Sequence, residues 1–254
     1  MKTKTLFLFL IIFSLNGLFA NEKYEETLET VDELISFTHT DLSAEYTIVT
    51  KEPSGSITKT KSAMFRRDSK EQFTILILEP TIDKGKGYLK DQNILWLYDP
   101  ANNGFTTTST KNRFQNTSIY VSDFSPINYA ENYKVDSAIK QKLGKFDCTV
   151  FELTTTNNSV TYDKTKIWVS EDNLIRKIED YSLSGQIMRT IAIPTYQKVS
   201  SKWLPQSMVI QDHLIYQIIN NKKVYQRTTV TIENPVAKKL PDLVYTKEYL
   251  ERAR

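Results

Sequence analysis

The sequence predicts a mainly β protein with some α structure, in the form of an unclosed antiparallel β-barrel of about 10 or 11 strands with helices over its mouth. From Leu42 onward, short stretches of alternating apolar and polar residues recur between turn residues, as in a meandering antiparallel sheet. Only residues 22–37 show apolar residues at helical spacing over three to four turns. Because a curled sheet has a concave interior, the helices are expected to cover it.

The first 20 residues have the layout of a secretory signal. Lys2 and Lys4 precede an apolar run from Leu6 to Leu15, which is too short to span a bilayer, and a short segment ends at Ala20. An N-terminal membrane anchor is the alternative. Because Asn21 rather than a cysteine follows the expected cleavage site, no lipidation is predicted. The rest of the chain is expected to be an exported protein.

Residues 21–254 are predicted to form a single domain, since no Pro/Gly/Ser-rich linker, repeat or low-complexity segment divides them. Removing the signal takes two lysines from a formal net charge of +3, which leaves a nearly neutral chain. With no long basic block, nucleic-acid binding is not indicated. Cys148 is the single cysteine of the sequence, so no intrachain disulfide can form, and a buried position in a strand is expected for it.

The elements are predicted in the following order. The amphipathic helix over 22–37 carries its apolar residues at Leu28, Val31, Leu34 and Ile35. A hairpin pairs 42–52 with 57–68 around "PSGS", and strands follow at 71–80, 86–91, 93–100 and 104–111.

The segment 120–135 interrupts this pattern. Ser125 and Pro126 predict the N-cap and the first position of a helix of about two turns, which carries Ile127 and Tyr129. Strands are then predicted at 140–155, 161–172, 173–182, 186–199, 202–212 and 226–235, and a short helix follows Thr246.

The stretch Ile94–Tyr98, "ILWLY", is apolar at every position. Since successive side chains of a strand point to opposite faces, both faces need a non-aqueous neighbour. We expect the concave interior to cover one face, and a helix or a turn of the sheet to cover the other.

The residues do not indicate an enzyme. The two histidines lack metal-ligand spacing, and no nucleophile elbow, P-loop or dinucleotide fingerprint is present. Neighbouring acids such as Glu179 and Asp180 point to opposite faces of a strand, which does not suit paired acid–base catalysis. No metal and no cofactor are expected.

Large apolar side chains instead share one face of several strands. This face either fills an ordinary core or lines a hollow that takes acyl chains, because open pockets are also largely apolar. The candidate cavity residues are Tyr46, Ile48, Phe73, Ile75, Ile77, Trp96, Tyr98, Ile191, Met208, Ile210, Val230 and Ile232.

Two stretches, "EPTIDKGKGYLKDQNILWLYDP" and "SIYVSDFSPINY", resemble the signature of the outer-membrane lipoprotein-sorting proteins, the LolA-like family. The matching positions are Pro80, either Lys84 and Gly85 or Lys86 and Gly87, then Tyr88, Leu89, Trp96, Tyr98, Pro100 and Ser122 to Ser125. The segment after Tyr162 and the closing "LPDLVYTKEYL" are similar too, so the resemblance covers most of the chain.

The resemblance implies an unclosed barrel with a helical lid over a hydrophobic cavity. A carrier of this family works in the periplasm as a chaperone of lipoprotein acyl chains, accepting them from an inner-membrane ATP-driven (ABC-type) exporter and delivering them to an outer-membrane acceptor. The lid would comprise Leu28, Val31, Leu34, Ile35, Ile127 and Tyr129, and Arg66 and Arg67 are loose counterparts of a lid-holding arginine. A monomer is expected.

Two other functions remain open from the sequence. One is a carrier of another lipid or amphiphile with the same fold. The other is a cavity-free domain that binds an envelope protein through its surface.

Overall fold

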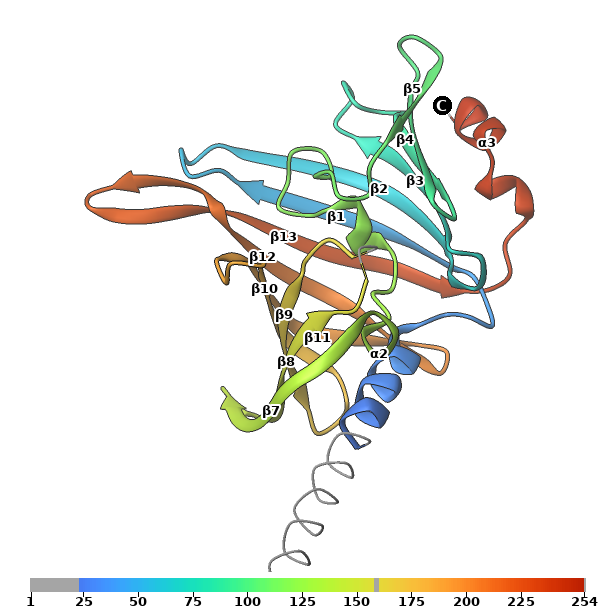
Figure 1. The fold of residues 1–254 in the computed structure, drawn as a ribbon. Coiled ribbons are helices and arrows are strands. Elements are labelled where there is room, and N and C mark those ends of the chain that lie inside the picture. Colours follow the sequence, from blue (N-terminus) through green and yellow to red (C-terminus); the bar gives the residue numbers. More distant parts are fainter. Residues whose placement is uncertain (1–22, 158–159, 254) are drawn as a thin grey trace, which may run out of the picture.

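The computed structural model in Figure 1 describes residues 23–157 and 160–253. Within them, one antiparallel sheet of 13 strands runs in the order β6-β5-β4-β3-β2-β1-β13-β12-β11-β10-β9-β8-β7 and does not close on itself. The predicted fold class, an unclosed antiparallel barrel with helices, is confirmed. The expected signal over residues 1–20, with its cleavage near Ala20, lies outside the described residues.

The strands follow the chain as a meander, apart from one long connection and the pairing of β1 with β13. They are β1 (Leu42–Lys51), β2 (Ile57–Arg67), β3 (Gln72–Glu79), β4 (Gly87–Asp91), β5 (Ile94–Asp99), β6 (Gly104–Thr108), β7 (Tyr133–Leu143), β8 (Phe146–Thr155), β9 (Lys164–Ser170), β10 (Ile175–Tyr181), β11 (Ile187–Val199), β12 (Lys202–Ile219) and β13 (Lys222–Ala237).

The sheet differs from the prediction in two places, and the first of them adds a strand. The predicted strand 140–155 is a hairpin, because Gly144 adopts a positive φ of 59° and turns the chain between β7 and β8. The sequence predicts no element for residues 213–225, yet they extend β12 and β13 into one long hairpin that turns at Asn220 and Asn221, both with positive φ.

The helices are short except at the N-terminal end, where residues 23–35 are helical as predicted. The others are η1 (Asp68–Lys70), η2 (Val121–Phe124), α2 (Tyr129–Asn132), η3 (Asp242–Tyr245) and α3 (Lys247–Arg252). The helix after Thr246 is confirmed, and the Thr246 hydroxyl caps it by accepting a hydrogen bond from the Tyr249 N–H.

The helix predicted to begin at Ser125 and Pro126 is wrong in its position. Ser125 has an extended backbone and ends η2, and α2 begins only after Asn128, which has a positive φ of 54°. The Tyr120 N–H donates to Asp123 Oδ2 at 2.8 Å, so the first turn forms before Ser125 instead of after it.

The connection between β6 and α2, residues 109–128, lies inside the curled sheet, and we call it the interior segment. Phe114, Ile119, Val121 and Phe124 of this segment are buried in the main hydrophobic cluster. The Phe124 ring lies 4.9 Å from the Phe114 ring and 5.6 Å from the Tyr46 ring, centroid to centroid. The interior segment therefore fills much of the space that the sheet encloses.

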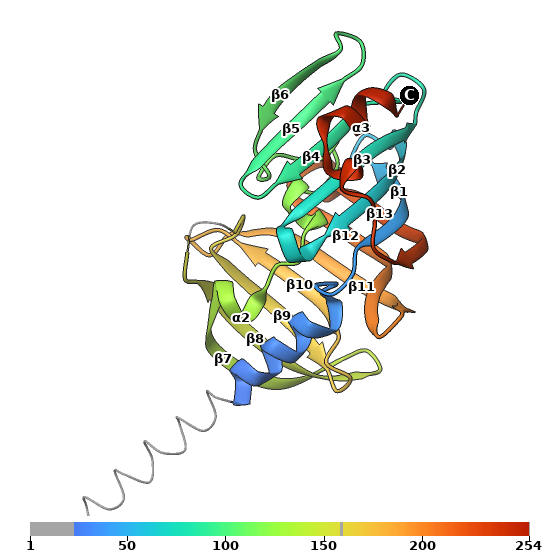
Figure 2. The ribbon, with the colours of Figure 1, turned by 90° about the vertical axis from the view of Figure 1, so that its right-hand side faces the viewer.

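The apolar stretch in β5 is covered on both faces from Leu95 to Tyr98, as expected, whereas Ile94 at its start is exposed. Leu95 and Leu97 face the main cluster, whereas Trp96 and Tyr98 belong to a second cluster on the other face, together with Leu250 of α3. The C-terminal helix is therefore the second cover, and it lies over β3, β4 and β5 in Figure 2. The prediction that Trp96 and Tyr98 lie on the cavity face is wrong. Their neighbours Leu95 and Leu97 lie on the inner face instead, because successive residues of a strand alternate between the two faces.

Within residues 23–157 and 160–253, no helix combines the length and the apolar character that crossing a bilayer requires. Cys148 is buried in β8, as predicted.

Candidate functional site

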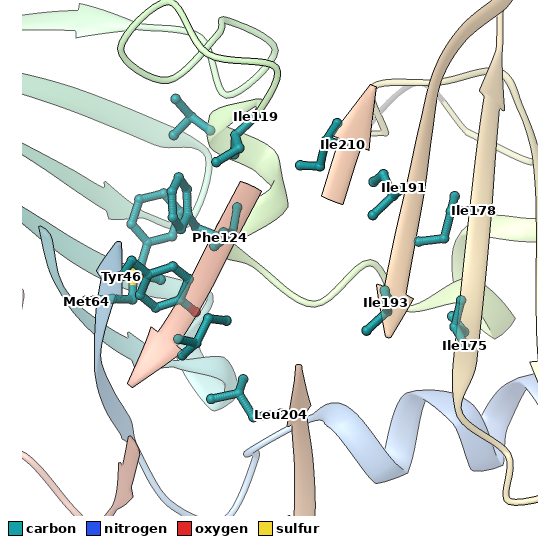
Figure 3. Close-up of a cluster of buried hydrophobic side chains, with 14 of the residues drawn as sticks. Tyr46, Met64, Ile119, Phe124, Ile175, Ile178, Ile191, Ile193, Leu204 and Ile210 are labelled. Atoms are coloured by element: carbon teal, nitrogen blue, oxygen red, sulfur yellow. The ribbon is translucent and has the colours of Figure 1, made fainter. Parts of the chain in front are cut away.

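An apolar cavity of about 140 Å³ lies between the interior segment and the strands of the second half of the sheet. Figure 3 shows Phe124 and Ile119 on one side of the space and the isoleucines of β10 and β11 on the other. Because side chains of alternate residues share a face, β11 supplies Ile191 and Ile193, and β10 supplies Ile178.

The candidate cavity residues fall into three groups. Six of them line the cavity: Tyr46, Ile191, Met208, Ile210, Val230 and Ile232. Four others are buried in the main cluster without lining it: Ile48, Phe73, Ile75 and Ile77. Trp96 and Tyr98 lie under α3, on the opposite face of the sheet.

Most of the residues predicted to form a lid lie in the main hydrophobic cluster or line the apolar cavity. Leu28 and Val31 are buried in the main cluster, Leu34 is half-buried, and Ile35, Ile127 and Tyr129 line the cavity. The N-terminal helix and α2 are tied together, since Asp32 Oδ2 accepts a hydrogen bond of 2.8 Å from the Ala130 N–H.

Asp32 is an unusual group at this contact. Its Oδ1 is buried and has no hydrogen-bond partner. Burial raises the pKa of its carboxyl to about 6, although the N–H groups of α2 act in the opposite direction. The junction between the two lid helices therefore contains an acid that titrates near neutral pH.

Of the two arginines suggested as lid contacts, Arg66 reaches the lid. Its Nη2 donates to the Ile35 carbonyl at 3.2 Å, and its guanidinium pairs with Asp68. The Asp68 Oδ2 in turn accepts from the Phe37 N–H at 2.7 Å. This pair therefore holds the C-terminal end of the N-terminal helix.

Arg67 points to the other face of β2 and holds the C-terminal segment instead. It makes two hydrogen bonds with the Asp41 carboxylate, at 3.0 and 2.9 Å, and donates to the Leu240 carbonyl at 2.8 Å. Its guanidinium stacks on the Tyr245 ring at 4.3 Å. The assignment of Arg67 to the lid is therefore wrong, because adjacent residues of a strand face opposite ways.

A buried charge network that the sequence reading missed joins the lid region to the sheet. Arg189 of β11 donates to both carboxylate oxygens of Asp123, at 2.6 and 2.8 Å, and its Nε donates to Asp180 Oδ2 at 2.6 Å. Asp180 also accepts from the Thr165 hydroxyl at 2.8 Å. Burial disfavours the charge of Arg189, but the two carboxylates raise its pKa well above the ordinary value.

A signal for this network was present in the sequence. Arg189 shares the inward face of β11 with Ile191 and Ile193, and Asp180 shares that of β10 with Ile178, because their spacing is two. A buried charged residue on an otherwise apolar face must be paired with an opposite charge in the folded protein. Arg189 and Asp180 therefore each indicated that an oppositely charged partner lies nearby.

A polar cleft of about 640 Å³ adjoins the apolar cavity. Both spaces are lined by Arg66, Asp123, Ser125, Pro126, Ile127, Tyr129 and Arg189. Apart from Val160, the rest of the cleft is lined by hydroxyl, amide and charged side chains that include Gln92, Asn93 and Lys90. The two spaces therefore meet at residues 123–129, with mostly apolar side chains on one side and mostly polar side chains on the other.

A family model with the description "-like: Uncharacterized protein" matches residues 69–252. The chain belongs to this family. No curated protein matches the chain in sequence.

Solved structures show which fold it has. A LolA superfamily protein from Nitrosomonas europaea is 22% identical, with a TM-score of 0.73 over 88% of this chain and 97% of that chain. A putative outer membrane lipoprotein-sorting protein domain from Vibrio parahaemolyticus is 17% identical, with a TM-score of 0.78 over 91% and 100%. A DUF1329 family protein from Desulfovibrio piger is 15% identical, with a TM-score of 0.78 over 91% and 98%. The resemblance to the LolA-like proteins is confirmed, and the chain has the LolA fold.

Across the described parts of the LolA fold in this chain, no group of three or more His, Cys, Asp and Glu side chains is arranged to hold a metal ion.

Proposed function

We propose that this protein is a periplasmic carrier that shields the acyl chains of a lipoprotein and delivers them towards the outer membrane. The observation that carries the proposal is the apolar cavity, which is lined by Ile35, Ile127 and Tyr129 of the predicted lid and adjoined by a polar cleft. An acylated protein has both characters in one molecule. Its acyl chains would enter the cavity, and the hydrophilic part near them would lie in the cleft.

The cavity must enlarge to take its cargo. Its 140 Å³ is below the ~300–1,000 Å³ typical of ligand pockets. The volume is small because Phe124 and Ile119 of the interior segment occupy the enclosed space. Cargo entry therefore requires the interior segment and the lid helices to move outward, with acyl chains replacing their apolar contacts.

Three polar contacts oppose this movement. Arg66 holds the end of the N-terminal helix, Asp32 holds α2, and Arg189 holds the interior segment through Asp123. Burying an acyl chain contributes about 0.8 kcal/mol per CH₂, so a partly buried chain offsets the loss of contacts of this kind. A carrier needs the closed and loaded states to be close in free energy, because otherwise it could not release its cargo.

Partners follow from the same proposal. An ABC-type exporter in the inner membrane would supply the acylated protein, and an acceptor at the outer membrane would receive it. The alternative cargo is another lipid with similar chains, which would use the same cavity without these partners.

The deciding experiment is native mass spectrometry of the exported protein, with extraction of whatever it carries. A bound triacylated protein or peptide supports the proposal, and a bound phospholipid favours the alternative cargo. A bare mass, together with no uptake of an added triacylated peptide, would contradict both carrier functions. The domain would then be one that binds through its surface, with the interior segment as permanent core.

A further inference from the structure

The outer part of the β12–β13 hairpin, residues 213–226, extends beyond the sheet, and we call it the projecting hairpin. β12 pairs with β11 only as far as Asp212, and β13 pairs with β1 only from Arg227 onward. Within the described residues, the two strands between these points pair only with each other. Figure 1 shows this ribbon reaching past the neighbouring hairpins.

The base of the projecting hairpin is held firmly. A bulge interrupts the pairing after Asp212, whose Oδ1 accepts from the N–H groups of Leu214 and Ile215 at 2.8 and 3.3 Å. The Asp212 Oδ2 pairs with Arg113 of the interior segment. Gln226, on the opposite strand, accepts from the Ser118 hydroxyl at 2.8 Å. A bulge re-aims the strand that contains it, so these contacts fix the direction of the ribbon.

The projecting hairpin exposes large apolar side chains on both of its faces. Ile218 is 68% exposed and the adjacent Ile219 is 42% exposed, and consecutive residues of a strand point to opposite sides. Leu214 and Tyr216 are also exposed. A single isolated hairpin has little stability in water, so apolar exposure on both faces needs an explanation.

The two adjoining hairpins extend the apolar surface. Ile57 follows the β1–β2 turn and is 65% exposed, and Leu183 lies in the β10–β11 turn and is 70% exposed. The pairs Lys51↔Arg227 and Arg189↔Asp212 place both turns at the same end of the sheet as the projecting hairpin.

The projecting hairpin itself carries positive charge, although Glu52 of the β1–β2 hairpin accepts a hydrogen bond from Gln226 at its base. No Asp or Glu occurs between His213 and Ile232, whereas Lys222, Lys223 and Arg227 do. Lys222 and Lys223 lie directly opposite Ile219 and Ile218 in the ribbon. Apolar side chains beside lysines are the combination that binds at the boundary between lipid headgroups and acyl chains.

We propose that the projecting hairpin docks the protein on the surface of a bilayer that contains anionic lipids. A protein partner or a second copy would cover one face of the ribbon, whereas a bilayer surface surrounds its tip on both faces. Ile218 and Ile219 then reach the acyl boundary while Lys222 and Lys223 contact headgroup phosphates. This inference goes beyond the proposed function and holds whatever the cavity carries.

The test is co-sedimentation of the exported protein with two kinds of vesicle, one containing phosphatidylglycerol and the other only phosphatidylcholine. We expect stronger binding to the first kind, weakened by added salt. Lys222→Gln and Lys223→Gln should each lower the partition by about fivefold on the anionic vesicles. Ile218→Ser with Ile219→Ser should lower it by at least about tenfold on either kind.

Ile139→Ser on β7 is the matched control, since Ile139 is 57% exposed and lies on an edge strand away from the hairpin. It should leave the partition unchanged, and thermal unfolding should show that all variants remain folded. Failure of the unaltered protein to bind either vesicle, or equal binding by the Ile218/Ile219 variant, would overturn the inference. A dimer in solution that Ile218→Ser dissociates would overturn it in favour of a second copy.

Discussion

Arg189 on β11 holds Asp123 of η2 by two parallel hydrogen bonds, Nη1 to Oδ2 at 2.6 Å and Nη2 to Oδ1 at 2.8 Å. This bidentate pair joins β11 of the sheet to the interior segment, which fills much of the space that the sheet encloses. The same arginine pairs with Asp180, and its guanidinium lies 4.7 Å from the centre of the Tyr162 ring. Asp123 and Arg189, which are 66 positions apart in the sequence, therefore hold the interior segment against the sheet.

Replacing Arg189 with methionine should destabilise the protein strongly. The change leaves the buried Asp180 and the largely buried Asp123 without a compensating charge, and breaking a buried pair in this way costs about 3–5 kcal/mol. Urea unfolding measures the loss. Asp172→Asn is the control, because its pair with Arg176 is half-exposed and should contribute less than about 1 kcal/mol. Losses of equal size would contradict a buried network.

Asp123→Asn should affect movement more than folding. The amide keeps the size of the side chain, and Arg189 keeps its pair with Asp180, but the charge that holds the interior segment is lost. We expect faster uptake of a fluorescent acylated peptide, measured by stopped flow, with a smaller loss of stability than in Arg189→Met. An unchanged uptake rate would show that the interior segment does not open by releasing Arg189.

Asp32 should make stability depend on pH between about 4 and 6. Its pKa is about 6 in the folded protein and 3.8 ordinarily, so the folded state holds the proton more tightly. This contribution to stability is fully present below about pH 4 and is lost as the pH rises through 6. Asp32→Asn keeps an acceptor for the Ala130 N–H, so it should raise the free energy of unfolding at pH 7 by about 1–3 kcal/mol.

The measurement for Asp32 is urea unfolding at pH 4, 5.5 and 7, with the variant compared with the unaltered protein at each pH. The difference between them should grow from pH 4 to pH 7. Glu26→Gln is the control, because Glu26 is exposed on the same helix and is not among the groups that raise the pKa of Asp32, so it should give the same small difference throughout. A pH-independent difference for Asp32→Asn would contradict the raised pKa.

Met208→Trp should block the cavity without unfolding the protein. Met208 lines the cavity and is only half-buried, so the larger indole can extend into the 140 Å³ of free space. We expect binding of an acylated peptide to fall by at least about tenfold while the thermal midpoint changes little. Ile139→Trp, at an exposed position, should leave binding unchanged. Undiminished binding by Met208→Trp would place the cargo elsewhere.

Gly87→Ala should disturb the contact between β4 and α3. A Cβ at this position would overlap Leu250 Cδ2 and lie 2.9 Å from the Ile75 carbonyl oxygen, and the backbone oxygen cannot move aside easily. The expected loss of stability is about 1–3 kcal/mol, measured by urea unfolding. Gly104→Ala on β6 is the control, since its nearest atom would lie at 3.7 Å. An equal effect of both changes would show that α3 is not tightly packed.

Much of the fold could be predicted because its signals are local. Alternation and turn residues predicted most of the strands, and helical spacing predicted the N-terminal helix. Errors arose where local signals were ambiguous. Trp96 and Leu95 are both large and apolar, so alternation alone could not assign them to a face, and only the position of Leu250 decided it. In residues 213–225, apolar and polar residues do not alternate as they do in a strand with one buried face, because both faces of the ribbon are exposed.

The candidate site was only partly predictable, for a related reason. Ile191 and Ile210 were found because each is apolar on an inward face. Arg66 was found through the resemblance to the LolA-like proteins. Asp32 was missed because an acid within an amphipathic helix normally faces solvent. Its burial depends on α2, which lies almost 100 residues further along the chain.

The sequence by itself determined that the chain forms one open antiparallel sheet with an amphipathic helix, since period-two and period-3.6 patterns act between near neighbours. Only the tertiary structure decided which strand faces line the cavity, that the interior segment fills it, and that Arg189 meets Asp123. Those relationships depend on how the 13-stranded sheet in the described residues curls. The curl brings together residues that are far apart in the sequence, and no pattern among near neighbours predicts such contacts.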